Sequence, residues 1–441
     1  MPESWRELRG EALFRRVIHP ISMETFFEVH WEKKPLHVPG RGHEYFTGLF
    51  SKAVLEARVK KGGLMYGDDL NVGKCVNGEQ HMQNGEDAVE WDAVEAMWKA
   101  GCSLQAVRPQ RYSTVVHTFV EAFEDVFHCL AGSNSFMTPT SSQGFKPHYD
   151  EVEVFMLQIE GRKRWRLYRD NSRGPLPLRG MCWDIKEQGL ELLLDTWVEA
   201  GDMLYLPRGT IHQGVASDDG PSHHLTISTY QRFAWVDFLS KGFSEALERA
   251  AADDVRFRAG LPLHLLETAG VAPSSDGVGK IREKVRELLG PLGDHFDVSA
   301  AADAMAAQFV ARRLPPSISV ADAEYHKGVS VRWANPSGVR VIVETLATGS
   351  ETQIYHCGDN DATAHQGTED PTPECVVLEG TYYLSALQML FREHPKYVGV
   401  GSLPKITGVD NGELVEGLMS HGLLEVEKPA PSTKKRKRFA E

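Results

Sequence analysis

The chain has 441 residues, of which 41% are hydrophobic, and a formal net charge of −13. This length and composition predict a multi-domain protein with packed cores, and no apolar run reaches the roughly 18 residues that a membrane span needs. The charged amino terminus lacks an apolar signal core, so neither membrane insertion nor secretion is expected. The six cysteines form no Cys-x-x-Cys pair, which favours reduced thiols.

The first predicted region, residues 1–239, contains short strands, aromatic residues and loops typical of a double-stranded β-helix, or jelly roll, with helical additions at its amino end. Its most informative feature is His148-Tyr149-Asp150. Side chains alternate faces along a strand, so His148 and Asp150 should point the same way. Both can therefore reach one metal ion.

The stretch after Asp150 predicts two strands, 152–159 and 163–168, joined by a turn at Glu160-Gly161. Lys163 shares a face of the second strand with Trp165 and Leu167. A lysine among apolar neighbours is costly without an anion, so it either binds an anionic co-substrate such as 2-oxoglutarate or extends its ammonium group to the surface.

A third metal ligand follows in Tyr205-Leu206-Pro207-Arg208-Gly209-Thr210-Ile211-His212. Residues 203–206 read as a short strand that Pro207-Arg208-Gly209 ends, which places His212 just beyond the strand. Two imidazoles and one carboxylate can fill one face of a ferrous ion and leave the other face open for a co-substrate and oxygen. A zinc hydrolase or another cupin-like metal enzyme is the alternative for such a ligand set.

Helical spacing of apolar residues begins near residue 240 and predicts three amphipathic helices, around 239–250, 281–289 and 302–309. A helical region of this size, 240–316, has much apolar surface to cover, and pairing with a second copy would cover it.

Residues 317–428 are expected to form a third domain of the winged-helix type. Strands are predicted at 329–333, 339–346 and 423–426, helices near 384–391 and 414–418, and a polar loop at 347–374. Few basic residues cluster there, which argues for protein contacts and against sequence-specific nucleic-acid binding. A zinc site could be built from His356, Cys357, His365 and Cys375, but the Gly, Asp, Thr and Pro residues around them favour a loop.

The last residues, 429–441, form a tail that we expect to be disordered, with the basic cluster Lys434-Lys435-Arg436-Lys437-Arg438. Such a cluster is typical of a nuclear localisation signal, the alternative being a solvated basic terminus. The rest of the chain is more acidic than the whole, which suits basic protein segments better than phosphates.

Several motifs together resemble the JmjC-domain ribosomal oxygenases. Those in the predicted barrel are Gly132-Ser133-Asn134, Ser142-Gln143-Gly144, Pro147-His148-Tyr149-Asp150, Glu160-Gly161-Arg162-Lys163, Tyr205 to Gln213 and Thr226-Ile227-Ser228-Thr229-Tyr230-Gln231. Upstream stretches resemble most the MINA branch, ribosomal oxygenase 2; they include Trp31-Glu32-Lys33-Lys34-Pro35-Leu36, Met65 to Val72, Cys75-Val76-Asn77-Gly78 and Pro109-Gln110-Arg111-Tyr112.

This resemblance implies a protein hydroxylase that uses Fe(II), 2-oxoglutarate and O2, with His148, Asp150 and His212 as iron ligands. It implies that Lys163, Thr226 and Asn134 bind the co-substrate. Positions near the substrate side chain would be Asn71, Gln110, Arg111 and Ser228. One departure is Phe136, which stands where the family motif has tyrosine, so a hydroxyl is lost from the pocket.

The resemblance also implies the target, a histidine side chain of a large-subunit ribosomal protein, with arginine a less suitable target because it would need acidic partners. The alternatives are demethylation of methyl-lysine on a histone tail and a non-catalytic adaptor in chromatin or ribosome assembly. A homodimer formed through the helical region and a nuclear, nucleolar location are expected.

Overall fold

The computed structural model describes residues 5–427 apart from 6, 173, 179–184, 186–188, 230–231, 264, 270–277, 318–324, 327, 368–372, 374, 406–407 and 409. The chain divides into two compact units, one of Met1–Gln231 with Val310–Glu441 and the other of Arg232–Phe309. Among the described helices, none has the length and apolar character to cross a membrane. The expected basic tail lies outside the described residues.

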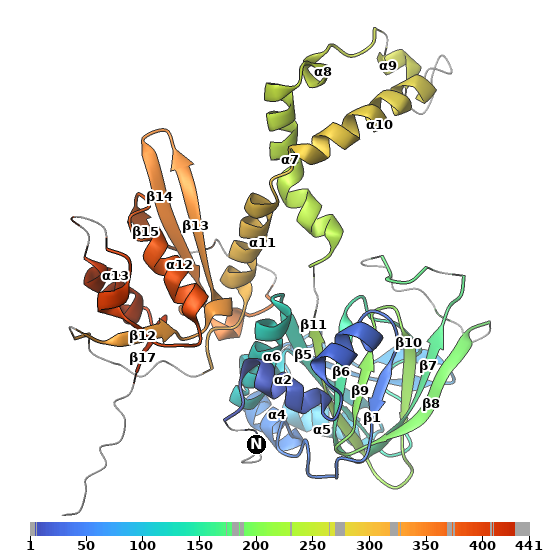
Figure 1. The fold of residues 1–441 in the computed structure, drawn as a ribbon. Helices are drawn as coiled ribbons and strands as arrows, with labels where there is room; N and C mark the ends of the chain where they lie inside the picture. The colour runs from blue at the N-terminus through green and yellow to red at the C-terminus, as the bar shows by residue number, and fades with distance from the viewer. Residues whose placement is uncertain are drawn as a thin grey trace, which may run out of the picture. The chain divides into compact units, whose positions relative to one another are not determined.

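Two antiparallel sheets lie within the described part of residues 36–229 in the first unit (Figure 1). The larger has the order β1-β9-β6-β11-β5-β4-β2-β3 and the smaller β10-β7-β8. The bounds in the larger sheet are β1 (Leu36–Val38), β2 (Leu70–Val76), β3 (Glu79–Met82), β4 (Ser103–Val107), β5 (Ala131–Thr138), β6 (Glu153–Glu160), β9 (Met203–Leu206) and β11 (Ser222–Thr229). Those in the smaller sheet are β7 (Arg162–Arg169), β8 (Glu191–Glu199) and β10 (Ile211–Ala216). The strands predicted at 152–159, 163–168 and 203–206 are confirmed.

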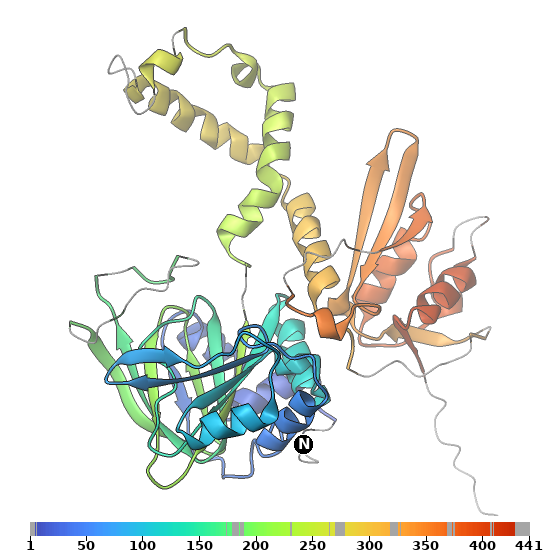
Figure 2. The same ribbon diagram turned by 180° about the vertical axis from the view of Figure 1, so that it is seen from behind.

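Strand β6 lies between two hydrophobic cores, because its side chains are buried on both faces of the sheet. Phe155 and Leu157 belong to the core that contains the amino-terminal helices, whereas Val154 and Met156 pack with Trp165 of the second sheet. Alternation along the strand thus divides its side chains between two cores. The amino-terminal helices, blue to teal in Figure 2, are α2 (Gly10–Ile18), α3 (Met23–Thr25) with the π-helix Phe26–His30, α4 (Lys52–Lys60), α5 (Trp91–Lys99) and α6 (Thr114–Phe127).

The local structure around the predicted metal ligands differs from expectation in two ways. His148 makes only an isolated bridge, to His212, and Asp150 lies outside any strand. His212 lies within β10, not beyond a strand end. The sequence pattern missed β10 because the Gly209 turn separates it from β9 by only four residues, and its Gly214 weakens the strand signal.

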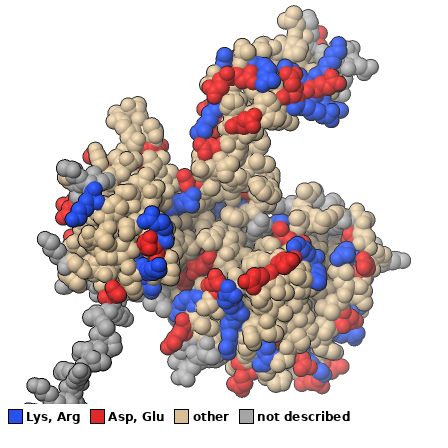
Figure 3. Space-filling view, viewed as in Figure 1, with Lys and Arg blue, Asp and Glu red and all other residues tan. Residues whose placement is uncertain are grey.

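The second unit is helical. Its elements are α7 (Trp235–Asp253), α8 (Val255–Arg258), α9 (Leu265–Thr268), α10 (Val278–Asp294) and most of α11 (Val298–Arg312), so the three predicted helices are confirmed. Its small core contains Ala246, Ala250 and Leu292. Acidic and basic side chains are interspersed along one face (Figure 3), while apolar side chains such as Leu247 and Leu289 are exposed.

Among its described residues from 325 on, the carboxyl-terminal part of the first unit contains two three-stranded sheets and two α-helices. They are β12 (Ser330–Trp333), β16 (Val398–Gly399) and β17 (Leu424–Val426); β13 (Val339–Leu346), β14 (Gly349–His356) and β15 (Cys375–Glu379); and α12 (Leu384–Glu393) and α13 (Asn411–Ser420). The loop predicted at 347–374 is wrong in part, because β14 runs through it. Its buried residues Thr352, Ile354 and His356 alternate with polar ones that hid the strand signal.

Candidate metal centre and co-substrate pocket

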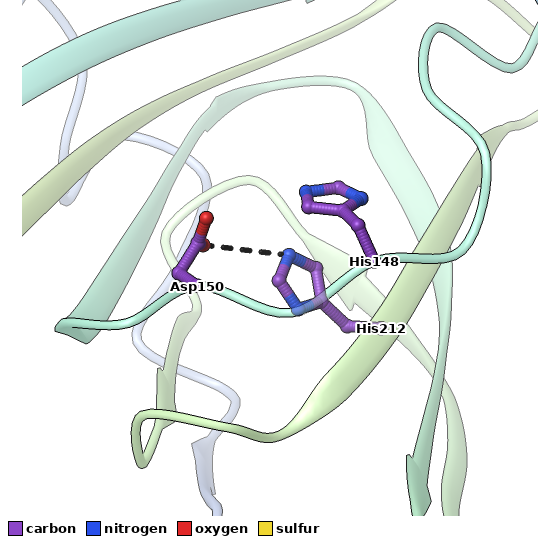
Figure 4. A group of neighbouring side chains, drawn as sticks. All are labelled: His148, Asp150 and His212. Atoms are coloured by element: carbon purple, nitrogen blue, oxygen red, sulfur yellow. Dashed lines mark ion pairs between the residues drawn. The ribbon is translucent and has the colours of Figure 1, made fainter. Parts of the chain in front are cut away.

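The predicted metal ligands converge. One ligand atom from each of His148, Asp150 and His212 lies within 4.8 Å of the other two (Figure 4). Nε2 of His212 is 3.7 Å from Oδ2 of Asp150, and the imidazole ring centroids are 4.4 Å apart. A metal ion bound by the three would be held on one side only, as a 2-His-1-carboxylate triad requires.

The backbone fixes this convergence. The His212 amide donates to the His148 carbonyl at 2.8 Å, and the His148 amide donates back at 3.2 Å. The Gly209 amide donates to the Asp150 carbonyl at 2.8 Å, and this bond holds Asp150 against the turn before β10. Gly209 has φ +82°, a left-handed conformation that suits glycine.

Both imidazoles are oriented for metal binding by their second nitrogen. Nδ1 of His148 lies 2.8 Å from the Lys146 carbonyl oxygen, and Nδ1 of His212 lies 2.9 Å from the Thr210 carbonyl oxygen. Each Nδ1 therefore carries the proton that it donates, and Nε2 is left with its lone pair for a metal. Burial lowers the pKa of His212, which keeps its imidazole neutral as a metal ligand must be.

A cavity of about 190 Å³ adjoins the three ligands. Its lining comes from both sheets: Gln105, Asn134, Phe136, Phe145, His148, Asp150, Val152, Val154, Met156, Lys163, Trp165, His212, Gln213, Gly214, His224, Thr226 and Ser228. Of the predicted co-substrate and substrate residues, Lys163, Thr226, Asn134 and Ser228 line it. Asn71, Gln110 and Arg111 do not.

Lys163 is a buried cation with no carboxylate at ion-pair distance in the described part of the chain. It is 5% exposed, and its Nζ donates to the Thr138 hydroxyl at 3.1 Å and lies 5.0 Å from the centre of the Trp165 ring. Burial lowers its pKa to about 7. The alternative of an ammonium group extended to the surface is therefore wrong, and an anion in the cavity would relieve the cost of burying the charge.

Gly214 makes room for this lysine, a role that the sequence did not reveal. A Cβ at Gly214 would lie 2.9 Å from Cε of Lys163 and 3.0 Å from the Trp165 ring. Only glycine leaves that space, because β10 and β7 pair directly at this point.

Two residues that line the cavity, Thr226 and His224, each have a buried polar atom without a hydrogen-bond partner among the described residues. These atoms are Oγ1 of Thr226 and Nδ1 of His224. His224 is 2% exposed and stacks on Phe136, its partner across the strands, at 5.0 Å between ring centroids. Buried polar groups are normally bonded, so a bound ligand is expected to satisfy these two. Together with Lys163 they fit a carboxylate, even though Phe136 has no hydroxyl.

Comparison with known proteins identifies the family. A model of the JmjC domain matches residues 105–235. Over 444 aligned residues the chain is 34% identical to ribosomal oxygenase 1 of Gallus gallus, which covers 96% of this chain and 73% of that protein. The chain belongs to the ribosomal oxygenase family. This oxygenase is also 30% identical, over 448 residues, to the bifunctional lysine-specific demethylase and histidyl-hydroxylase NO66 of Drosophila yakuba, covering 95% of this chain and 64% of that one.

The predicted family is thus confirmed, and with it a JmjC oxygenase that uses iron, 2-oxoglutarate and O2. The predicted ribosomal oxygenase 2 branch gains no support from these relatives, which carry other names. The oxygenase spans 66% of the length of the Bos taurus ribosomal oxygenase 1 and 80% of the Danio rerio protein. The solved structure of Escherichia coli YcfD has a TM-score of 0.50 at 16% identity, covering 92% of this chain and 98% of that one, and shows likeness of fold alone.

Asn71 reaches the cavity only through a residue that the sequence pattern did not single out. Its Nδ2 donates to Gln105 Oε1 at 3.1 Å, and its Oδ1 accepts from Asn84 Nδ2 at 2.8 Å. Gln105 lines the cavity. Asn71 therefore positions the Gln105 amide. The alternation of side chains along β4 could have indicated from the sequence that Gln105 faces the cavity.

Gln110 and Arg111 contact the carboxyl-terminal part of the oxygenase. Gln110 is 1% exposed, lies 3.1 Å from Nδ1 of His365, and accepts from the Ser133 hydroxyl at 2.6 Å. Arg111 donates to the His365 carbonyl at 2.7 Å. Nε2 of His365 is 3.0 Å from Glu124. This buried network joins the 3-10 helix Pro109–Arg111 to the segment after Ala362–Ala364, so the predicted substrate role has no geometric support.

We expect Gln110→Ala to lower the free energy of unfolding by about 1–3 kcal/mol, because it leaves two buried polar groups without a partner. The KM for a peptide substrate should not change. Urea denaturation and steady-state kinetics measure the two quantities. In a double-mutant cycle with His365→Ala, the stability losses should be non-additive by about 0.5–3 kcal/mol. A raised KM with unchanged stability would restore the substrate role.

Proposed function

We propose that this oxygenase hydroxylates a histidine side chain of a large-subunit ribosomal protein. With iron and 2-oxoglutarate bound, the oxidative decarboxylation of 2-oxoglutarate by O2 would supply an oxidant strong enough to hydroxylate an unactivated C–H bond. The chain's own residues then hold the metal on one side, fix the co-substrate and position the target carbon. His148, Asp150 and His212 would hold the iron.

Lys163, Thr226 and His224 would bind the distal carboxylate of 2-oxoglutarate. The support is the buried ammonium group and the two orphan polar atoms, which belong to residues lining the same cavity as the metal ligands. A charge-assisted hydrogen bond is stronger than one between neutral groups.

The observation that carries the choice of histidine is the charge of the cavity. Among the described residues its only lining carboxylate is Asp150, which the metal would occupy, and its other polar groups include the amides Gln105, Asn134 and Gln213 and two hydroxyls. Amides can donate to and accept from a neutral imidazole, whereas a guanidinium needs acidic partners. The histidyl-hydroxylase name of the Drosophila relative agrees with this choice.

The test uses ribosomal proteins and peptides from them, incubated with Fe(II), 2-oxoglutarate and 18O2, with His148→Ala as the inactive control. Mass spectrometry should find one labelled oxygen atom on a defined histidine, absent when that histidine is replaced by alanine. Formaldehyde release from a methyl-lysine peptide would favour the demethylase instead. Succinate formation no greater than that of His148→Ala would favour a non-catalytic adaptor.

We also propose the finer organisation and location. The two sheets would form the double-stranded β-helix, and the carboxyl-terminal sheets and helices a winged-helix domain. Exposed apolar side chains on the second unit, including Trp235, Leu247, Val285 and Leu289, support pairing with a second copy. The basic cluster of the tail supports import into the nucleus. A ribosomal-protein substrate would favour the nucleolus within it.

A further inference from the structure

A second group of metal-binding side chains lies far along the chain from the catalytic centre. One ligand atom from each of His356, Asp359 and His421 lies within 4.8 Å of the other two, the same limit that groups the three catalytic ligands. In the described part of the chain these are the only two such groups of His, Cys, Asp and Glu. We propose that His356, Asp359 and His421 bind a zinc ion.

The distances suit zinc after a small adjustment. Oδ2 of Asp359 is 3.9 Å from Nε2 of His356 and 3.7 Å from Nδ1 of His421, and the imidazole centroids are 5.2 Å apart. Zinc bonds of about 2.0–2.2 Å in a tetrahedron place neighbouring ligand atoms about 3.3–3.5 Å apart. The two pairs that include Asp359 therefore need to close by only a few tenths of an ångström, and Asp359 is exposed enough to move. The ligand nitrogens of the two histidines lie within 4.8 Å of each other.

The backbone holds the three residues in place. His356 ends β14, Asp359 lies in the following turn, and His421 is the residue after α13. A Cβ at Gly358 would lie 3.2 Å from the His421 carbonyl oxygen and 3.5 Å from Nδ1 of His356, so the turn is packed against both histidines. Asn360 anchors the turn by donating to the carbonyl oxygens of Val310 and Arg313 at 2.8 and 2.9 Å.

The chemistry favours a transition metal over a simple ion pair. Within the described residues, the only ion-pair partners of Asp359 are the two imidazoles, with no lysine or arginine. Imidazole and carboxylate together suit zinc, and His356 is buried while the other two face solvent, so water can complete the shell. The bound ion would link the β13–β14 hairpin to the carboxyl end of α13.

This set differs from the zinc site that could be built from His356, Cys357, His365 and Cys375, where the sequence favours a loop. His365 belongs to the network with Gln110 and Glu124. Cys375 pairs with Tyr355 across the sheet. Only His356 is common to both sets, and its partner His421 comes from a helix end that sequence spacing did not connect to it.

Zinc content of the full chain tests the proposal, since the catalytic triad also takes divalent metals. After zinc loading and removal of free metal, the wild type should retain two equivalents per chain, His421→Ala one, His148→Ala/His212→Ala one, and the triple variant none. His295→Ala is the matched control and should retain two, because Nδ1 of His295 lies 3.7 Å from Oδ2 of Asp253 with no third ligand among the described residues.

A second readout does not depend on counting metal. Zinc should raise the Tm of His148→Ala/His212→Ala but not that of the triple variant, and His421→Ala should form succinate at the wild-type rate. Equal zinc retention by wild type and His421→Ala, or an unchanged Tm of His148→Ala/His212→Ala on adding zinc, would overturn the proposal.

Discussion

Replacing His148 or Asp150 by alanine is expected to lower kcat for succinate formation by more than about 100-fold. The reason is that even partners one step removed from a metal change affinity or activity by about 10–100-fold, and these two residues would bind the metal directly. His148 and Asp150 are only partly buried and line the cavity, so replacing them by alanine should have little effect on the stability of the fold. Succinate release and iron content, measured together, check the prediction.

The matched control for this prediction is His43→Ala, which removes an exposed imidazole from the same unit. Its kcat and iron content should equal those of the wild type. Thermal unfolding of every variant separates loss of metal from loss of fold. Wild-type turnover by Asp150→Ala would mean that the three groups do not share an ion.

Local pattern singled out the three residues whose possible ligand atoms the structure brings together. His148, Asp150 and His212 follow from a His-x-Asp pair and a later histidine, although the predicted details of their strands are wrong. The three residues converge because two backbone hydrogen bonds join His148 to His212. Neither segment alone predicts this pairing between residues 64 positions apart.

The residues that the sequence could not place are those whose role depends on distant partners. The amide side chain of Gln110 is chemically suited to contact a substrate. In the structure, however, His365, which lies 255 positions away, holds it in a buried network. Gly214 is visible as a glycine, but only the packing of Lys163 against it explains the need for one. Long-range contact, not local propensity, decides both cases.

Removing the charge of Lys163 should weaken binding of 2-oxoglutarate and abolish its pH dependence. Losing one partner of a buried charge pair costs about 2–5 kcal/mol, so Lys163→Met should raise Kd by about 30-fold to several thousand-fold. Arg164→Met is the matched control, because Arg164 is the next residue of β7 and its side chain is exposed, paired with Asp195. Its Kd should not change.

The direction of the pH dependence follows from the pKa of about 7 that burial gives Lys163. The carboxylate binds the protonated ammonium group, whose population falls as pH rises through 7, so the Kd of the wild type should be nearly constant below that pH and rise about tenfold per unit above it. Calorimetry without O2, at saturating metal, measures Kd between pH 6 and 8.5 and the protons taken up on binding. Lys163→Met should show neither the rise nor the uptake, and a wild-type Kd independent of pH would place the carboxylate elsewhere.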